Sequence, residues 1–263
     1  MRLNLDRLKE ALHRAKIHRP DLVFVIRPGN PASVGASREE WKALVEFCLA
    51  RGTRLVNDAA YSGLAGVSHT PLANVAKDYP KLEWMELYSV SKSFNDPGAR
   101  LGAVVGSRDF VEDFRLIKGN ADSGPVPSVM AAYGEFLADR AAARAALDDL
   151  RALYERRLGY VIPKLREAGL REACRTEAGF FTLWKVPRRV FGIDLGKKAE
   201  LRHETFNRRV IQESGIVGVH FLGPELEGRR EPLIRYAVCS DVLASDFKNR
   251  FERELARMRP EYE

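Results

Sequence analysis

Two spacings of hydrophobic residues alternate along the first 125 residues of the chain. Residues 4–16 place leucine and alanine at steps of three and four, which predicts an amphipathic helix. Residues 22–26, LVFVI, form a short apolar run rich in β-branched residues, as expected for a strand that is covered on both faces. The chain is therefore expected to begin with a helix, a buried strand and a loop at the Pro-Gly-Asn-Pro that follows.

The same alternation continues towards residue 105. Ser37 and Glu40 form a capping-box pattern, which predicts the start of a helix that ends at Gly52. Further strands are predicted over residues 53–57, 82–90 and 101–105, the last two separated by the polar loop SKSFNDPGAR. Short apolar strands that alternate with helices are typical of an α/β domain with a mostly parallel sheet.

The pattern changes after about residue 125. One helix and then a very long one are predicted up to residue 169. A strand over 180–186, a helix over 198–213, strands near 216–220 and 233–239, and a final helix over 243–257 are expected beyond it. This order predicts a large domain over residues 1–150 and a smaller C-terminal α+β domain over residues 151–263.

Composition excludes several classes of protein. The chain has 263 residues, of which 45% are hydrophobic and 30% charged, and no apolar run approaches the roughly 18 residues of a membrane helix. Cys48, Cys174 and Cys239 are far apart, which argues against a disulfide framework or a zinc site. The net charge of +7 is spread beside acids, so we expect no nucleic-acid partner. Without a secretory signal, the cytoplasm is the expected compartment.

Polar side chains follow three of the predicted strands. They are Asn30 after the first, Asp58 and Tyr61 after the second, and Ser89, Ser91, Lys92 and Arg100 around the third. Open α/β sheets form their ligand crevices at the carboxyl ends of the strands. If these strands are neighbours, the side chains converge on one pocket.

The residue types in this set favour one kind of ligand. A lysine that is desolvated beside another cation, as Lys92 would be, becomes a nucleophile towards carbonyl groups. Ser89, Ser91 and Arg100 together suit a phosphate group. Asp58, at the mouth of a buried strand, needs a cation or a protonated ring nitrogen. An aldehyde that carries a phosphate and a basic ring nitrogen meets all three requirements.

Four stretches of the chain carry a family resemblance. VIRPGNP, LVNDAAYSGL, YSVSKSFNDPGARLGAVVG and LIRYAVCS resemble, in order and spacing, signature segments of the class I and II pyridoxal-phosphate aminotransferases of fold type I. The chain looks most similar to the aspartate and diaminopimelate branches. The resemblance implies a fold type I large domain with a smaller C-terminal domain, pyridoxal 5'-phosphate as cofactor, a homodimer, and transfer of an amino group between an amino acid and a 2-oxo acid.

The resemblance also implies roles around the cofactor ring. Lys92 matches the lysine that holds the cofactor as an imine and then moves a proton. Asp58 matches the carboxylate that pairs with the ring nitrogen and keeps it protonated. Tyr61 and Asn30 match the groups that hydrogen-bond the phenolic oxygen, and Asn30 is also expected to contact the substrate.

Four more residues match binding positions of the family. Ser89 and Arg100 match ligands of the phosphate, and Ser91 is a weaker candidate for the same task, with a simple loop hydroxyl as its alternative. Arg235 in LIRYAVCS matches the arginine that binds the α-carboxylate of the substrate. Its alternative is a surface charge on an edge strand.

The chain departs from the family in several places. Members carry a long stretch before the segment that begins here at Met1, and it usually supplies a phosphate-binding turn, an aromatic ring stacked on the cofactor and a lid. NPASVG and NDPGARLG also differ from the commoner forms. We therefore consider a chain that needs a separate N-terminal polypeptide, a truncated and catalytically impaired relative, and another subunit that supplies the lost groups. A carbon–sulfur or other β-lyase, with the same lysine, is the alternative enzyme.

Other conspicuous residues are expected to be structural. Trp41, Leu44 and Phe47 share one face of a predicted helix and are expected in the core. His69 and His220 lack metal-ligand partners nearby in the sequence, so a surface or loop position is expected for both. The alternative for His220 is a position that borders the substrate pocket.

Overall fold

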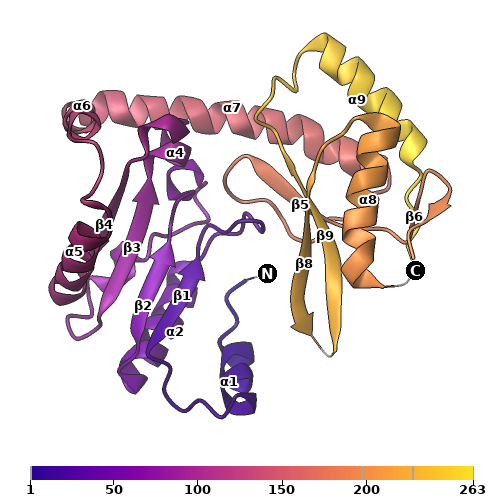
Figure 1. The fold of residues 1–263 in the computed structure, drawn as a ribbon. Coiled ribbons are helices and arrows are strands. Elements are labelled where there is room, and N and C mark those ends of the chain that lie inside the picture. The colour runs from indigo at the N-terminus through magenta and orange to yellow at the C-terminus, as the bar shows by residue number, and fades with distance from the viewer. Residues whose placement is uncertain (1, 197, 227, 263) are drawn as a thin grey trace. The chain divides into compact units, whose positions relative to one another are not determined.

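The computed structural model describes residues 2–196, 198–226 and 228–262, which form two compact units (Figure 1). The first unit contains the chain up to Asn30, together with Val34–Arg151 and Glu177–Gly179. The second contains Pro31–Ser33, Ala152–Thr176 and the chain from Phe180 onward. The assignment of these units as a cofactor-binding domain and a small domain stays a prediction.

The first unit is built on a four-stranded sheet. Its strands are β1 (Leu22–Ile26), β2 (Arg54–Asp58), β3 (Trp84–Ser89) and β4 (Gly102–Gly106), in the order β1-β2-β3-β4. The first three strands run parallel, whereas β4 is antiparallel to β3. The predicted α/β fold with a mostly parallel sheet is confirmed.

One face of this sheet carries the main core of the unit. Helix α2 (Arg38–Arg51) and the short helix α3 (Ala73–Ala76) pack there against a cluster that includes Val23, Leu55 and Trp84. Trp41, Leu44 and Phe47 of α2 belong to the same cluster, as predicted. The capping box is confirmed, because Ser37 and Glu40 each bind the backbone of the other. Helix α1 (Leu5–Arg14) lays three partly buried leucines on this core.

Helix α5 (Arg108–Asp122) packs on the opposite face, beside β3 and β4 (Figure 1). The Arg54 guanidinium lies 4.8 Å from the centroid of the Phe110 ring, and a Cβ on Gly106 would lie 3.1 Å from Val111. This helix was not among the elements that the hydrophobic pattern predicted. None of its residues is fully buried: Phe110, Val111 and Phe114 are partly buried, whereas Leu116 and Ile117 are exposed.

The prediction that β1 is covered on both faces is wrong. Val23 is buried beneath α2, but the side chains of Leu22, Phe24 and Ile26 point to the other face and are exposed. Successive side chains of a strand point to opposite faces, so these three form one apolar stripe. A continuous apolar run therefore does not establish burial on both faces at a sheet edge.

The segment after β3 is more ordered than the predicted loop. Residues Val90–Ser93 form a one-turn helix, α4, and Pro97–Ala99 form the 3-10 helix η2, while Ser62–Leu64 form η1 after β2. The predicted succession of one helix and a very long one is confirmed by α6 (Pro127–Ala138) and α7 (Arg140–Glu167). No helix in the described ranges is both long and apolar enough to cross a membrane.

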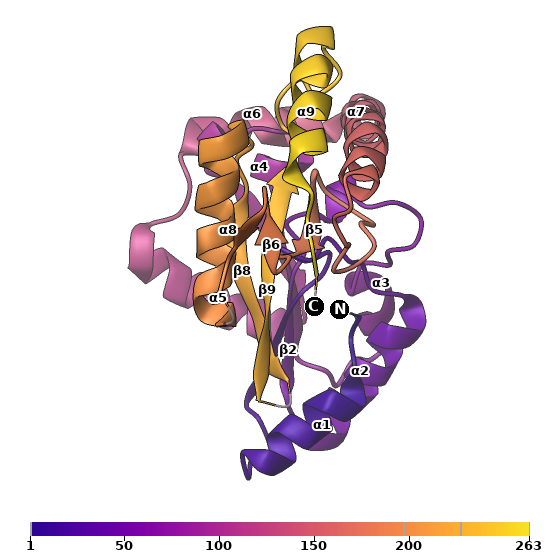
Figure 2. The same ribbon diagram turned by 90° about the vertical axis from the view of Figure 1, so that its right-hand side faces the viewer.

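The second unit contains an antiparallel sheet of β5 (Phe181–Lys185), β9 (Arg229–Ala237) and β8 (Val219–Leu226), with β9 in the middle. Helix α8 (Ala199–Ser214) packs against β8 and β9, and α9 (Ser245–Met258) follows the sheet (Figure 2). A small hairpin joins β6 (Arg189–Val190) to β7 (Ile193–Asp194). The strand predicted near 216–220 starts later, because Gly215 ends α8 in a left-handed conformation.

Candidate active site

The carboxyl ends of β2 and β3 bring two predicted site residues to the same face of the sheet. Asp58 is the last residue of β2 and pairs with Leu87 of β3. Ser89 lies two residues after Leu87, so the Ser89 side chain points to the same face of the sheet as Asp58. One oxygen of Asp58 accepts a hydrogen bond from the backbone N–H of Ala60 at 3.0 Å. Within the described part of the chain, no lysine or arginine forms an ion pair with Asp58, which leaves its carboxylate available to a cationic ligand.

Lys92 and Tyr61 lie together beside these strand ends. Lys92 is half-buried in α4, and its Nζ lies 5.8 Å from the centroid of the Tyr61 ring. Tyr61 follows β2 and is only 7% exposed. A Cβ on Gly63 would lie 2.5 Å from Ser93 Oγ, so the turn that carries Tyr61 approaches α4 closely only because residue 63 is glycine. The local backbone thus fixes the amine against the aromatic ring.

A buried network that the sequence reasoning missed ties these strand ends together. Asn57, which precedes Asp58, accepts a hydrogen bond from the backbone N–H of Arg27 and donates one to its carbonyl oxygen, both at 2.9 Å. Asn57 also donates to Glu86 at 2.8 Å. The side chain of Asn57 therefore holds the end of β1, which leads to Asn30, against β2 and β3.

Glu86 is the centre of this network. The side chain is fully buried and accepts four hydrogen bonds, from Asn57, from the backbone N–H groups of Leu72 and Ala73, and from the Tyr88 hydroxyl. Burial, followed by the neighbouring charge of Glu86, raises the pKa of Tyr88. A glutamate inside the apolar strand WMELYS was the sequence signal for it, since a buried carboxylate requires donors.

The remaining predicted ligands of the first unit lie around these elements. Asn30 is exposed in the turn after β1, and Ser91 is half-buried in α4. Arg100 is exposed, has a left-handed backbone conformation and donates a hydrogen bond to the carbonyl oxygen of Pro97 at 3.1 Å. The conformation described here thus directs the Arg100 guanidinium to its own loop, and its role as a phosphate ligand stays a prediction.

Arg235 lies in the second unit, on the central strand β9. The alternative of an edge-strand charge is therefore wrong. Its guanidinium carbon lies 4.7 Å from the centroid of the Phe181 ring and 5.6 Å from that of Phe221. Stacking on aromatic rings restrains the planar guanidinium and suits it to hold a carboxylate in a fixed direction.

Within the described residues, His69 does not form a second catalytic site. His69 is half-buried rather than on the surface, and burial, followed by the charge of Arg27, lowers its pKa to about 4. Its Nδ1 accepts from the backbone N–H of Ala36, so Nε2 carries the proton and donates to the Ser62 hydroxyl. Ser62 is therefore not activated as a nucleophile.

His220 has a partner that the sequence reasoning missed. Its ring lies 4.9 Å, centroid to centroid, from that of His203. Among the residues that the structure describes, no group of three or more possible metal ligands occurs. Cys48, Cys174 and Cys239 form no disulfide bond with one another.

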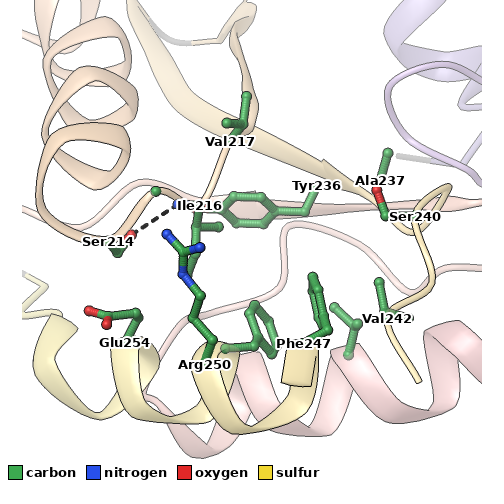
Figure 3. A pocket seen from close by; sticks show the side chains of 13 residues that line it. Ser214, Ile216, Val217, Tyr236, Ala237, Ser240, Val242, Phe247, Arg250 and Glu254 are labelled. Carbon is green, nitrogen blue, oxygen red and sulfur yellow. Dashed lines mark hydrogen bonds between the residues drawn. The ribbon is translucent and has the colours of Figure 1, made fainter. Parts of the chain in front are cut away.

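The second unit also contains a pocket of about 330 Å³ that none of the predicted site residues lines. Its walls come mainly from α7, α9, the end of α8 and β9. Figure 3 shows the Tyr236 ring extending across it towards Ile216 and the Arg250 guanidinium. The Tyr236 hydroxyl is inaccessible and has no hydrogen-bond partner in the described ranges, so it offers nothing to a ligand. We regard this pocket as separate from the candidate active site.

The residues of the first unit fit pyridoxal phosphate. A half-buried primary amine beside an aromatic ring suits its aldehyde, and the Asp58 carboxylate, which has no ion-pair partner among the described residues, suits its ring nitrogen. Ser89 adds a hydroxyl on the same face of the sheet as Asp58. Nothing in the geometry of Lys92, Asp58 and Tyr61 opposes the assignment.

Comparisons with known proteins identify the family. The model of aminotransferase class I and II matches residues 1–242. The LL-diaminopimelate aminotransferase of Natranaerobius thermophilus is 31% identical over 178 residues, which is 68% of this chain and 45% of that protein. That of Nitratidesulfovibrio vulgaris is 28% identical over 214 residues, 79% of this chain and 50% of that protein. The chain thus spans about half the length of these curated relatives.

Solved structures agree on the fold. The N-succinyldiaminopimelate aminotransferase of Mycobacterium tuberculosis superposes with a TM-score of 0.76 at 20% identity, over 97% of this chain and 62% of that one. The aspartate aminotransferase of Thermus thermophilus with maleate gives a TM-score of 0.72 at 20% identity, over 93% and 59%. Class I and II aminotransferases depend on pyridoxal phosphate. The chain belongs to the class I and II aminotransferase family.

Proposed function

We propose that this chain forms part of a pyridoxal-phosphate-dependent aminotransferase that moves an amino group between an amino acid and a 2-oxo acid. The observation that carries the proposal is the Lys92 amine, which lies against the Tyr61 ring beside the strand that ends in Asp58. Family membership supports it. The relatives and structures named above are aminotransferases, so the β-lyase alternative gains no support from them.

Each residue of the first unit has a physical task in this proposal. Lys92 would hold the cofactor covalently and, when released, its Nζ would accept the substrate Cα proton and deliver it to the cofactor carbon. Asp58 keeps a positive charge on the ring nitrogen by pairing with it. When bound, the cofactor supplies an electron sink that makes the Cα–H bond acidic. Tyr61 and Asn30 hydrogen-bond the phenolic oxygen and thereby orient the ring.

Substrate and phosphate binding fall to the remaining predicted residues. We assign phosphate binding to Ser89, Ser91 and Arg100, for which Arg100 must turn from the Pro97 carbonyl to the ligand. In the second unit, we assign Arg235 to the substrate α-carboxylate, supported by its two aromatic neighbours; in the first unit, we assign Asn30 to substrate binding. The names of the relatives favour a biosynthetic reaction on a diaminopimelate-like amino acid, and we propose the cytoplasm as its compartment.

We also propose a homodimer, which exposed apolar side chains of α5 and α6 support. Large hydrophobic residues on or next to these helices are exposed: Leu116, Ile117, Val126, Met130 and Leu137. Exposed apolar side chains that gather on one surface commonly mark an interface. A second copy that covers this face would bury it.

The test is covalent labelling of the lysine. The purified protein is incubated with pyridoxal phosphate, reduced with borohydride and digested, and the modified peptides are identified by mass spectrometry. The label is expected at Lys92, to vanish in Lys92→Ala and to persist in Lys77→Ala, a matched change at an exposed lysine of the same unit. Labelling spread over surface lysines, and equal in Lys92→Ala, would contradict the proposal.

A further inference from the structure

The pocket of about 330 Å³ in the second unit has walls that are mainly apolar. Val161 of α7 and Phe251 of α9 are buried beside it, and Ile216, Val242 and Phe247 complete these walls. Sites for small ligands commonly have volumes of about 300–1,000 Å³. The pocket therefore has room for one small molecule with an apolar body.

Arg250 brings a positive charge to this apolar space. Its side chain belongs to α9, and Figure 3 shows the guanidinium directed towards Ile216 and the ring of Tyr236. A Cβ on Gly215 would lie 3.1 Å from a terminal nitrogen of Arg250, so the left-handed glycine that ends α8 leaves room for the guanidinium. The cation therefore lies in the lining of the pocket, against the end of α8.

The carboxylate that would ordinarily pair with Arg250 already has other donors. Glu254 lies four residues later on the same helix, which is the usual position of an ion-pair partner. Its two oxygens instead accept hydrogen bonds from Arg253, at 3.0 Å, and from Arg257. These bonds, that of Arg253 first, lower the pKa of Glu254. Its negative charge is thus balanced without Arg250.

Carbonyl oxygens at the end of α8 are occupied as well. That of Val210 accepts from the Ser214 hydroxyl at 2.6 Å, and that of Glu213 accepts from Arg257 at 3.2 Å. Among the residues that the structure describes, Arg250 forms no hydrogen bond and no ion pair. A guanidinium carries five N–H donors, so those of Arg250 are available to a ligand in the pocket.

We propose that this pocket binds a small carboxylic acid with an apolar body. The carboxylate pairs with Arg250, whose planar fork can donate two parallel hydrogen bonds to it. The hydrocarbon body lies between α7 and α9, against the apolar walls. The inference is independent of the proposed function, because none of the residues assigned to that function lines the pocket.

Other classes of small ligand fit the pocket less well. A cationic ligand would face the positive charge of Arg250 at short range. A sugar or another strongly polar ligand would lose its hydrogen bonds to water against walls that offer few partners. A fully apolar ligand would leave the guanidinium without an acceptor.

Equilibrium dialysis with phenylbutanoate as the probe tests this site on the whole chain at neutral pH. Phenylbutanol, which has the same body but no charge, is the matched control ligand. We expect the wild-type protein to bind the acid about tenfold or more tightly than the alcohol, because a hydrogen bond between charged groups is stronger than one to a neutral hydroxyl.

Variants separate the two parts of the site. Arg250→Gln should weaken binding of the acid by about tenfold or more and leave binding of the alcohol unchanged. Phe247→Ala should weaken binding of both ligands, since it removes part of the apolar wall. Arg208→Gln is the matched control variant, because Arg208 is an exposed arginine of α8 that does not line the pocket. Arg250 is exposed too, and far-UV circular dichroism checks that each variant folds.

Three results would overturn the inference. The first is no saturable binding of the acid by the wild-type protein up to about 1 mM, the limit of weak specific binding. The second is binding of the acid by Arg250→Gln that is as tight as binding by Arg208→Gln. The third is loss of binding in Arg235→Gln but not in Arg250→Gln, which would assign the acid to the arginine of the proposed substrate site.

Discussion

Glu86→Gln is the sharpest test of the network beneath the candidate site. One carboxylate oxygen of Glu86 accepts from Asn57 Nδ2 at 2.8 Å and from the Leu72 N–H at 2.9 Å. The other accepts from the Ala73 N–H at 2.9 Å and from the Tyr88 hydroxyl at 2.8 Å. Glutamine offers one acceptor oxygen, and its NH₂ group cannot accept a hydrogen bond. At least one of the two pairs of donors must therefore lose its acceptor.

The loss of stability in Glu86→Gln depends on which orientation of the glutamine amide costs less free energy. If the glutamine NH₂ faces Tyr88, the hydroxyl can reverse and accept, so only the Ala73 N–H is left unpaired. A buried hydrogen-bond donor without a partner costs about 1–3 kcal/mol of stability. A hydrogen bond to a charged group contributes about 1.5–3 kcal/mol, and each bond that remains loses part of this contribution when the neutral glutamine replaces the carboxylate. Relief of the buried charge offsets some of this loss. We expect the free energy of unfolding to fall by about 2–4 kcal/mol.

Urea unfolding followed by circular dichroism measures the loss, and hydrogen exchange locates it. The amides of Leu72 and Ala73 should exchange faster in Glu86→Gln, whereas those of the second unit should not change. Glu83→Gln is the matched control, because Glu83 is only partly buried and forms an ion pair with Arg54, whose side chain is also partly exposed. Surface pairs contribute about 0–1 kcal/mol. Equal stability of the two variants, or unchanged exchange at residues 72 and 73, would refute the assigned role of Glu86.

Three further outcomes can be measured on the same protein. The folded-state pKa of His69 is lowered from 6.5 to about 4, so its contribution to stability is present above pH 6.5 and is lost as the pH falls towards 4. In His69→Gln, the urea concentration at the unfolding midpoint should therefore change less between pH 7 and pH 4.5 than in the wild-type protein. Tyr236→Phe removes a buried, unpaired hydroxyl and should leave the melting temperature unchanged or raise stability by about 1 kcal/mol, and a clear loss would show that the hydroxyl has a partner. Ellman's reagent should modify Cys239 in the native protein but not Cys48, which is buried with its pKa raised to about 12; fast loss of both thiols would contradict this burial.

Local signals predicted most of the fold. The capping box at Ser37 and the apolar runs at β1, β2 and β3 depend on residues close in the chain, and each element was found within a few positions. Helix α5 was missed because its apolar residues are not confined to one face: Leu116 and Ile117 are exposed, while Phe110, Val111 and Phe114 are partly buried. The exposed face of β1 was missed for a different reason. Burial of a strand depends on which elements pack on it, and the residues of the strand alone do not specify those elements.

The candidate site likewise contains residues that the sequence identified and contacts that it did not predict. Lys92, Asp58 and Tyr61 were singled out because each follows a strand, and the parallel order of the sheet brings those strand ends together. The partnership of Asn57 with Glu86 joins residues 29 positions apart, and only the register between β2 and β3 creates it. The conformation of Arg100 depends on whether its ligand is present, which no local pattern encodes.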